Sequence, residues 1–274
     1  MTMGPTRVPR PAVSRRRFLR LAAAAAGVAA AGAPAWRQAA TAADDVHRPR
    51  LRLPAATSNG SRVPITVDVA HPMDPGHHVT SITVVNPRDP VPVKGTFHFT
   101  PASGRAHVAF QARLDEGPSA VVATADCGRH GRFSASAPVT VAAGGGGCAG
   151  GPPAPGSGDG EIRPPVIRIP RLVAGLPVGD GEIIDVQVKV KHPSRTGLAL
   201  RDGRFVQEAE PFHLRDLEVF RDGERVSRFV LGAAMSDNPL ITFKLRARPE
   251  ATVAVALTNT RGDRFEATAR LRAG

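Results

Sequence analysis

Apolar and polar residues alternate along much of the chain, with the period of two that is typical of β-strands buried on one face. These runs lie at 63–69, 108–114, 133–141, 184–190, 253–257 and 265–271. Turn-forming sequences such as Ser-Asn-Gly at 58–60 and Arg-Asp-Gly at 221–223 separate the runs, and no long amphipathic helix is indicated. The pattern therefore predicts an all-β protein made of two immunoglobulin-like antiparallel β-sandwiches joined by a Gly/Pro-rich linker.

The two halves of the chain also match each other. Ile-Thr-Val-Asp-Val-Ala-His-Pro at 65–72 corresponds to Val-Gln-Val-Lys-Val-Lys-His-Pro at 186–193, and Arg132-Phe133 corresponds to Arg264-Phe265. We interpret the matches as a duplication, with convergent strand chemistry as the alternative. The predicted organisation is a leader at 1–42, a first sandwich at 43–143, an arm and linker at 144–160, and a second sandwich at 161–274.

The first 42 residues have the features of an export signal. Ser-Arg-Arg-Arg-Phe-Leu-Arg at 14–20 is a twin-arginine pattern, and the apolar run at 21–33 that follows it is shorter than the ~20 residues of a membrane span. The leader holds seven arginines and no acid, so its removal lowers the net charge from +12 to +5. We expect a periplasmic protein without a membrane span, whose scattered charge argues against nucleic-acid binding.

One cysteine, Cys148, lies within the glycine-rich segment that joins the halves. An exposed free thiol is prone to oxidation, so a cysteine with no apolar neighbours calls for a functional explanation. The bare backbone lets its sulfur reach up to about 24 Å from the sandwich. We therefore predict an exposed, reactive thiol on a swinging arm. The residues of this flexible arm are Gly144, Gly145, Gly146, Gly147, Ala149, Gly150 and Gly151.

The second cysteine, Cys127, lies in a predicted turn before the strand 132–141, whereas Cys148 follows the far end of that strand. Ten strand residues span ~33 Å, which the arm cannot fold back to cover. We therefore expect no disulfide between the two, although an oxidising compartment would permit one. Cys127 is interpreted as an incidental or partly shielded thiol.

Of the seven histidines in the first half, five are weighed as metal ligands: His71, His77, His78, His98 and His107. The adjacent pair at 77 and 78 would point to opposite faces of a strand, and the spacings fit no metal-binding rule. We expect no metal site and no cofactor. The arm cysteine has no histidine or acid close in sequence to serve as a base, and no nucleotide-binding loop is present, so a stand-alone enzyme is not predicted.

The first half resembles the SoxY sulfur carrier, whose chains end in a glycine-cysteine-glycine arm after an immunoglobulin-like sandwich. The resemblance rests on Gly-Gly-Gly-Gly-Cys-Ala-Gly-Gly at 144–151, Asn-Gly-Ser-Arg-Val-Pro at 59–64 and Arg132-Phe133. Two departures bear on function. Ala149 replaces a glycine of the family's usual arm, and the chain continues where a SoxY chain ends.

The second half resembles SoxZ, so that the chain resembles a fused SoxYZ. The matching segments are Ile-Pro at 169–170, Lys-His-Pro at 191–193, Glu-Pro-Phe at 210–212 and Ser-Asp-Asn-Pro-Leu-Ile-Thr-Phe at 236–243. The resemblance implies that Cys148 is the covalent attachment point for thiosulfate-derived sulfur. It also implies three partners: a haem c enzyme of the SoxAX type, a dimanganese enzyme of the SoxB type and a sulfane dehydrogenase of the SoxCD type. The two modules would pair within one chain or swap between two copies.

Two other interpretations stay open at this point. A SoxYZ-like carrier associated with a quinoprotein dehydrogenase would have the same arm cysteine. A secreted structural or adhesive sandwich pair, crosslinked through cysteine, is a different class of protein. Arg-Gly-Asp at 261–263 is compatible with the adhesive interpretation, but a turn between strands explains it more simply.

Overall fold

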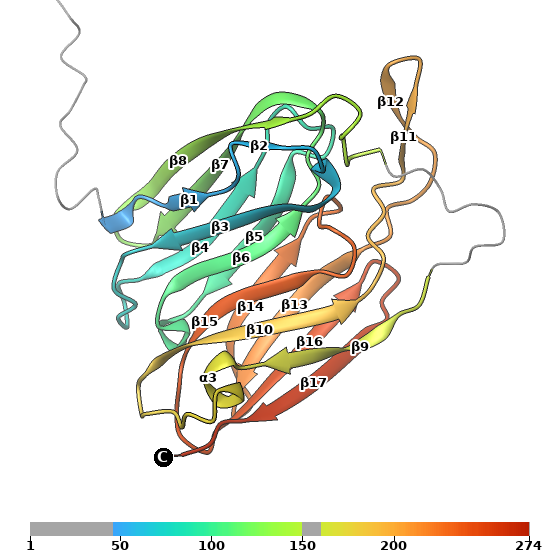
Figure 1. The fold of residues 1–274 in the computed structure, drawn as a ribbon. Coiled ribbons are helices and arrows are strands. Elements are labelled where there is room, and N and C mark those ends of the chain that lie inside the picture. The colour runs from blue at the N-terminus through green and yellow to red at the C-terminus, as the bar shows by residue number, and fades with distance from the viewer. Residues whose placement is uncertain (1–45, 150–159, 274) are drawn as a thin grey trace, which may run out of the picture. The chain divides into compact units, whose positions relative to one another are not determined.

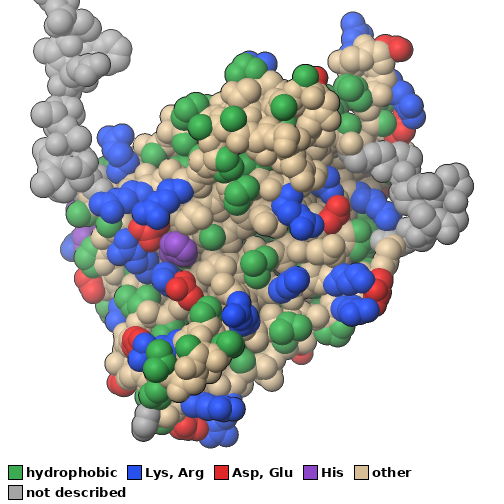
Figure 2. Space-filling model, in the orientation of Figure 1, with side chains coloured by type: hydrophobic (Ala, Val, Ile, Leu, Met, Phe, Trp, Pro, Cys, Tyr) green, Lys and Arg blue, Asp and Glu red, His purple; other side chains and the backbone are tan. Residues whose placement is uncertain are grey.

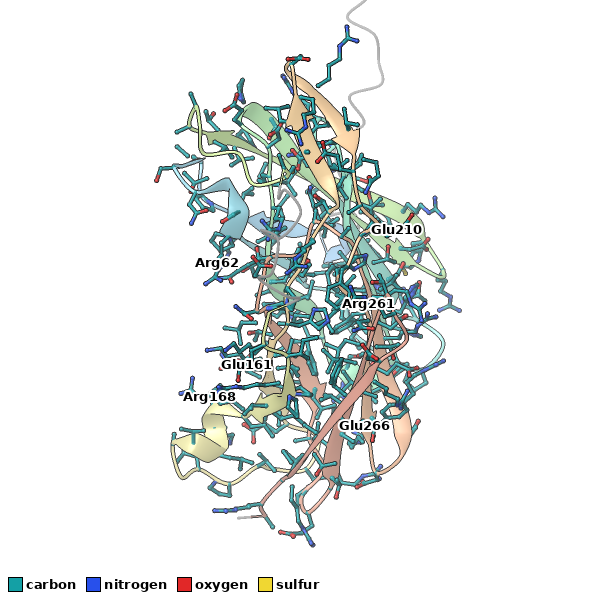
Figure 3. The ribbon with its side chains drawn as sticks, turned by 90° about the vertical axis from the view of Figure 1, so that its right-hand side faces the viewer. Arg62, Glu161, Arg168, Glu210, Arg261 and Glu266 are labelled. Atoms are coloured by element: carbon teal, nitrogen blue, oxygen red, sulfur yellow. The ribbon has the colours of Figure 1, made fainter. Side chains whose placement is uncertain are left out.

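The computed structural model describes residues 46–149 and 160–273. The predicted export signal at 1–42, together with Gly150, Gly151 and most of the predicted linker, lies outside the described residues. Two β-sheets form the double layer shown in Figure 1. Figure 3 shows this double layer from the side, with Arg168 on one layer and Glu266 on the other. The all-β prediction is confirmed.

The first sheet has six strands. Their spatial order is β1 (Arg50–Arg52), β3 (Val63–Val69), β6 (Ala106–Ala112), β15 (Leu240–Arg246), β10 (Ile183–Lys191) and β9 (Arg163–Arg168). The second sheet has nine strands. Their order is β17 (Arg264–Arg270), β16 (Thr252–Asn259), β13 (Leu214–Arg221), β14 (Glu224–Leu231), β5 (Val93–Phe99), β4 (Val79–Val85), β7 (Gly117–Cys127), β8 (Gly131–Val141) and β2 (Ala56–Thr57).

Shorter elements complete the described fold. They are the hairpin of β11 (Leu198–Arg201) and β12 (Arg204–Gln207), the 3₁₀ turns η1 (Gly60–Arg62) and η2 (Pro101–Ser103), and the single-turn helix α3 (Pro170–Val173). In the part of the chain that the structure describes, no helix has the length and apolar character needed to cross a membrane. Figure 2 shows basic side chains spread over the visible face, with acidic ones among them, rather than gathered in one stripe.

The two halves, called here module 1 (46–149) and module 2 (160–273), pair with each other in both sheets. β5 pairs with β14, which places Phe97 opposite Phe229, and β6 pairs with β15, which places Val108 opposite Phe243. Outward from this junction, β6-β3-β1 corresponds to β15-β10-β9, and β5-β4-β7-β8 corresponds to β14-β13-β16-β17. This pseudo-symmetry supports a duplication. We predicted two separate sandwiches joined by a linker. In the structure both sheets contain strands of both modules, so the two sandwiches form one continuous double layer.

Phenylalanine rings from both modules meet where the modules join. The ring centroid of Phe97 lies 5.0 Å from that of Phe110 and 5.3 Å from that of Phe229, which in turn lies 5.4 Å from that of Phe243. Aromatic pairs at such separations pack favourably, and burying one phenylalanine side chain contributes about 1.5–3 kcal/mol. The junction is therefore part of a core that both modules share.

The repeated His-Pro sequences have the same local geometry in both modules. His71 follows β3 and His192 follows β10, and Nδ1 of each donates a hydrogen bond at 2.5 Å to the carbonyl oxygen of the following proline. Because a carbonyl oxygen only accepts, this bond assigns the proton to Nδ1 in both rings. The other ring nitrogen, Nε2, therefore carries a lone pair, which is available to neighbouring groups at the end of the strand.

Candidate functional site

The arm, defined here as 142–149, turns back against module 1 after β8 ends. Within it, the Gly145 amide donates to the carbonyl of Ala142 at 2.9 Å. Two further backbone bonds attach it to the body: the Gly60 amide donates to the Gly145 carbonyl at 2.7 Å, and the Gly147 amide donates to the Leu114 carbonyl at 2.8 Å. The arm is thus docked by backbone hydrogen bonds, in the manner of an additional irregular strand.

The glycines of the arm permit this close docking. A Cβ on Gly145 would lie 2.6 Å from the carbonyl oxygen of Ser58, and a Cβ on Gly147 would lie 2.4 Å from backbone atoms of Gly60. Any side chain would force these backbone segments apart. We predicted the glycines as a source of freedom, and the structure adds a second role, since only glycine allows the arm to lie this close to η1.

Cys148 is fully buried, which contradicts the prediction of an exposed thiol. The hydroxyl Oγ1 of Thr196, in module 2, donates to the carbonyl oxygen of Cys148 at 2.7 Å. The next residue, Ala149, is exposed again. The prediction was wrong because it treated the arm as a linker surrounded by solvent, whereas groups from both modules hold it against the body.

Arg113 is the main side chain that fastens the arm. Its Nη1 donates to the carbonyl of Gly147 at 3.1 Å, and its Nη2 donates to the carbonyl of Ser194 at 2.9 Å and to Oδ2 of Asp237 at 2.7 Å. One guanidinium therefore joins the arm to two segments of module 2. No sequence pattern around Arg113 indicated this role, although Asp237 belongs to the segment at 236–243 that carries the SoxZ resemblance.

The 3₁₀ turn η1 lies between the arm and module 2 and contacts both. Its Gly60 amide donates to Gly145, as described above. Its Ser61 carbonyl oxygen accepts a hydrogen bond at 2.8 Å from Oγ of Ser236. Nη2 of Arg62, which is labelled in Figure 3, donates to the carbonyl of Asp237 at 3.3 Å. The segment at 59–64 that resembles SoxY therefore forms part of the surface on which the arm rests.

The surroundings of Cys148 keep its thiol protonated. Burial raises the pKa of Cys148 to about 12, with further raising by Asp89 and Asp115 and opposing effects from Lys94 and Arg113. Lys94 and Asp89 form a buried ion pair, with Nζ 2.5 Å from Oδ2 and both side chains at most 1% exposed. Since the charges around the sulfur largely oppose one another, loss of water decides its protonation. The docked thiol is therefore a poor nucleophile.

A groove lies beside the arm, where the β11–β12 hairpin projects from the body (Figure 1). Gly146 and Ala149 line one side of it, and Leu200 and Phe205 of the hairpin line the other. Leu200 is 53% exposed, which is unusual for a large apolar side chain. Residues of the arm and of the hairpin therefore line the same groove.

The two cysteines are both free, as we expected from their positions at opposite ends of β8. Cys127 is the last residue of β7 and is buried, so its thiol is fully rather than partly shielded. Its sulfur lies 4.0 Å from Nε2 of His71 and 3.8 Å from Nδ1 of His130.

The histidine expectation also requires correction. We expected no cluster of metal ligands, but His71 and His77 lie close together with His47, Cys127 and His130, whereas His78, His98 and His107 are not part of this group. The side chain of His107 instead contacts Asp68 at 3.2 Å. The sequence argument failed because it placed His77 on a strand, whereas this residue lies in the turn that precedes β4.

The Arg-Gly-Asp sequence at 261–263 forms the turn between β16 and β17, as predicted. Gly262 has a φ of 89°, which glycine adopts most readily. The guanidinium of Arg261 lies 3.9 Å from the ring centroid of Phe212, a cation–π contact within module 2. The local geometry thus accounts for the arginine and the glycine.

Solved structures with partial likeness to this chain include two of the superoxide reductase neelaredoxin from Ignicoccus hospitalis. The E23A form is 22% identical, covering 35% of this chain and 82% of that one at a TM-score of 0.33, and the other is 23% identical, covering 35% and 80% at 0.32. The Dpr2 Ig1-Ig2 complex with DIP-Theta Ig1-Ig3 is 12% identical, covering 83% and 99% at 0.23. These TM-scores are too low to assign a fold or a function. None of the curated proteins matches the sequence.

Two protein families match the chain, one for each module. The family described as sulfur oxidation protein SoxY matches residues 36–148, and the family described as sulphur oxidation protein SoxZ matches residues 177–270. The first match ends at the arm cysteine, and the second spans most of module 2. The chain is therefore a fused SoxYZ protein of the sulfur-oxidation system, in which a SoxY module and a SoxZ module share one double-layered β-fold.

Proposed function

We propose that this protein is a periplasmic carrier that holds thiosulfate-derived sulfur on Cys148 and presents it to the enzymes of the sulfur-oxidation pathway. The observation that carries the proposal is the position of Cys148, a free thiol in a glycine-rich arm at the last residue of the SoxY match. The carrier is a covalent substrate for its partners and has no catalytic residue of its own. The twin-arginine pattern at 14–20 supports export.

The docked arm represents a resting state in this proposal. A buried, protonated thiol is protected from the oxidation that threatens an exposed thiolate. Release of the arm breaks the hydrogen bonds from Thr196 and Arg113 and the backbone bonds at Gly145 and Gly147. Once these are broken, the glycines give the arm the freedom and reach that an entry tunnel requires. A partner that binds the groove beside Ala149 would promote this release.

Three partner reactions would then act on the released sulfur. A haem c enzyme would form a disulfide-type bond between the Cys148 sulfur and thiosulfate, and its haems would accept the two electrons. A dimanganese enzyme would hydrolyse the terminal sulfonate to sulfate, and a sulfane dehydrogenase would oxidise the sulfur that remains. The tether keeps each intermediate from diffusing away and raises its effective concentration at the next enzyme.

Fusion of the two modules limits how a partner can receive the arm. Since the chain continues beyond Ala149 into module 2, a partner accepts a loop unless the segment at 150–159 is cleaved after export. Ala149 adds one methyl group where the family has glycine, so the partner's channel that receives the arm must be slightly wider than one that fits glycine alone. The structure pairs the modules within one chain, which we propose as the working form.

The test is to replace Cys148→Ser and measure thiosulfate-dependent sulfate release with the three partner enzymes, together with the intact mass and peptide map of the carrier. The variant should abolish sulfate release and lose the sulfur adduct. The control Thr140→Ala alters an exposed residue of β8, the strand that leads into the arm, and should keep both. Circular dichroism should show the same fold for all three proteins.

Three outcomes would contradict the proposal. Unchanged sulfate release by Cys148→Ser would remove the cysteine from the reaction. A covalent dimer through Cys148 in the exported protein, without any sulfur adduct, would indicate crosslinking instead. Adducts formed from another sulfur donor, but not from thiosulfate, would indicate the carrier associated with quinoprotein dehydrogenases.

A further inference from the structure

Five potential metal ligands meet at one end of module 1, independently of the arm. They are His47, His71, His77, Cys127 and His130, and one nitrogen or sulfur atom of each lies within 4.8 Å of those of all the others. Their segments are distant in sequence: one precedes β1, two flank the loop between β3 and β4, one ends β7 and one lies in the turn before β8. We refer to these five residues as the histidine cluster.

The nitrogen atoms of the cluster are separated as if they shared one ion. Nε2 of His77 lies 3.1 Å from Nε2 of His71 and 3.0 Å from Nδ1 of His130, which lies 2.9 Å from Nε2 of His47. Two nitrogens bound to one metal at about 2.1 Å are about 3.0 Å apart at a right angle and about 3.4 Å apart at a tetrahedral angle. The observed separations match right angles, which are typical of five- and six-coordinate ions.

Hydrogen bonds among the rings can account for these contacts only if some of them are shared and bent. An imidazole nitrogen has a single in-plane site, which holds either a proton or a lone pair. Nδ1 of His130 is in contact with nitrogens of both His77 and His47, so it can form a proper hydrogen bond with only one of them. The other contact is then at best a bent, shared hydrogen bond, whereas a cation at the centre would accept a lone pair from each of these three nitrogens.

One ring is also oriented as a ligand would be. The Nδ1 proton of His71 is held by the carbonyl of Pro72, so its Nε2 directs a lone pair into the cluster. Metal-bound histidines commonly donate their second nitrogen to a carbonyl in this way. The ring of His47 is stacked on that of Phe133, with centroids 4.7 Å apart, which restricts its orientation as well.

Module 2 provides an internal comparison. His192 corresponds to His71, and Asn259 ends β16 where Cys127 ends β7. There the amide Nδ2 of Asn259 lies 3.3 Å from Nε2 of His192, and it also donates to Asp263 at 2.9 Å. An ordinary hydrogen-bonded pair therefore suffices at this end of a sandwich. The three additional imidazoles and the thiol of module 1 exceed what folding requires.

We propose that the histidine cluster binds one divalent first-row transition metal ion through four imidazole nitrogens and the thiolate of Cys127. Iron(II) suits this set, because imidazole and thiolate ligands are common for it and five donors exceed the four that structural zinc sites use. Five protein ligands leave one position of an octahedron for water or a small anion. His130 is exposed and His77 is half-buried, so this side of the site is accessible. The inference does not depend on the function proposed for Cys148.

The experiment uses the full, untagged chain, freed of metal by a chelator and titrated with iron(II) and with cobalt(II) in the absence of oxygen. We expect one ion per chain, a thiolate-to-cobalt charge-transfer band, and weak visible d–d absorption of a five- or six-coordinate ion. Cys127→Ser should abolish the band, and His77→Gln should weaken binding at least about tenfold. The controls His98→Gln, at an exposed histidine outside the cluster, and Cys148→Ser should bind as the unaltered chain does.

Several results would overturn the inference. They are binding of less than one ion per chain, equal binding by His77→Gln and by the unaltered chain, or loss of the charge-transfer band in Cys148→Ser rather than in Cys127→Ser. An intense tetrahedral cobalt spectrum would refute the arrangement of five ligands. If Cys127→Ser fails to fold, His130→Gln replaces it, because an exposed ligand can be changed without opening the core.

Discussion

Replacing Thr196→Val should release the arm and speed the chemical labelling of Cys148. The change removes the hydroxyl that donates to the Cys148 carbonyl at 2.7 Å and preserves the shape of the side chain. A buried carbonyl left without its partner costs about 1–3 kcal/mol in the docked state, whereas water satisfies it in the released state. The released population should therefore rise about 5- to 150-fold.

Labelling reports this population because the docked thiol hardly reacts. With the pKa of Cys148 raised to about 12, its thiolate fraction at pH 7.5 is on the order of a thousandfold below that of an exposed cysteine with a pKa of about 8.5. Alkylation under native conditions, followed by peptide mapping, should then give a rate proportional to the released fraction. Cys127 serves as an internal reference, since it is buried elsewhere and should not be labelled faster.

Thr260→Val is the matched control for this experiment. Its hydroxyl also donates to a backbone carbonyl of module 2, that of Pro211 at 3.1 Å, but away from the arm. It should leave the labelling rate of Cys148 unchanged. The reasoning is refuted if Thr196→Val and Thr260→Val label Cys148 equally, or if Thr196→Val accelerates both cysteines and so acts through global unfolding.

Two further predictions concern pH and the core. Because the pKa of Cys148 is raised in the folded state, the docked arm holds a proton that the unfolded chain loses above its ordinary pKa of about 8.5. Relative to Cys148→Ser, the native chain should thus lose up to about 1.4 kcal/mol of unfolding free energy per pH unit between pH 8.5 and 12, and a constant difference would contradict this. Phe229→Ala should lower the unfolding free energy by about 3–5 kcal/mol while both modules still unfold in one denaturant transition. Separate transitions in the native chain would show that the core is not shared.

The strands could be predicted from the sequence, but the junction between the modules could not. Alternation at 63–69 and 265–271 marks strands correctly because burial of one face is a local property. The pairing of β5 with β14 depends on which edges meet, and strand edges have no such periodic signal. For the same reason, the sequence predicted two sandwiches but not that they share both sheets.

The candidate site was predicted in part. Cys148 was found because an isolated cysteine among glycines is a local feature, but its burial depends on Thr196 and Arg113, which lie 48 residues further along and 35 residues earlier in the chain. The histidine cluster was missed because His47 and His130 are brought to His71 only by the folded sheets. A rule for strands could not describe residues that lie in turns.

The pairing of β5 with β14 and of β6 with β15 has a consequence for the fused chain itself. A protease cut within 150–159 would not separate the two modules, because both sheets continue without interruption through the junction between them. The peptide connection is therefore not what keeps the halves together. Its contribution lies in synthesis. Because one translated chain contains both modules, the SoxY and SoxZ halves are made in a one-to-one ratio. The strand edges of each module then find their pairing partners within the same chain.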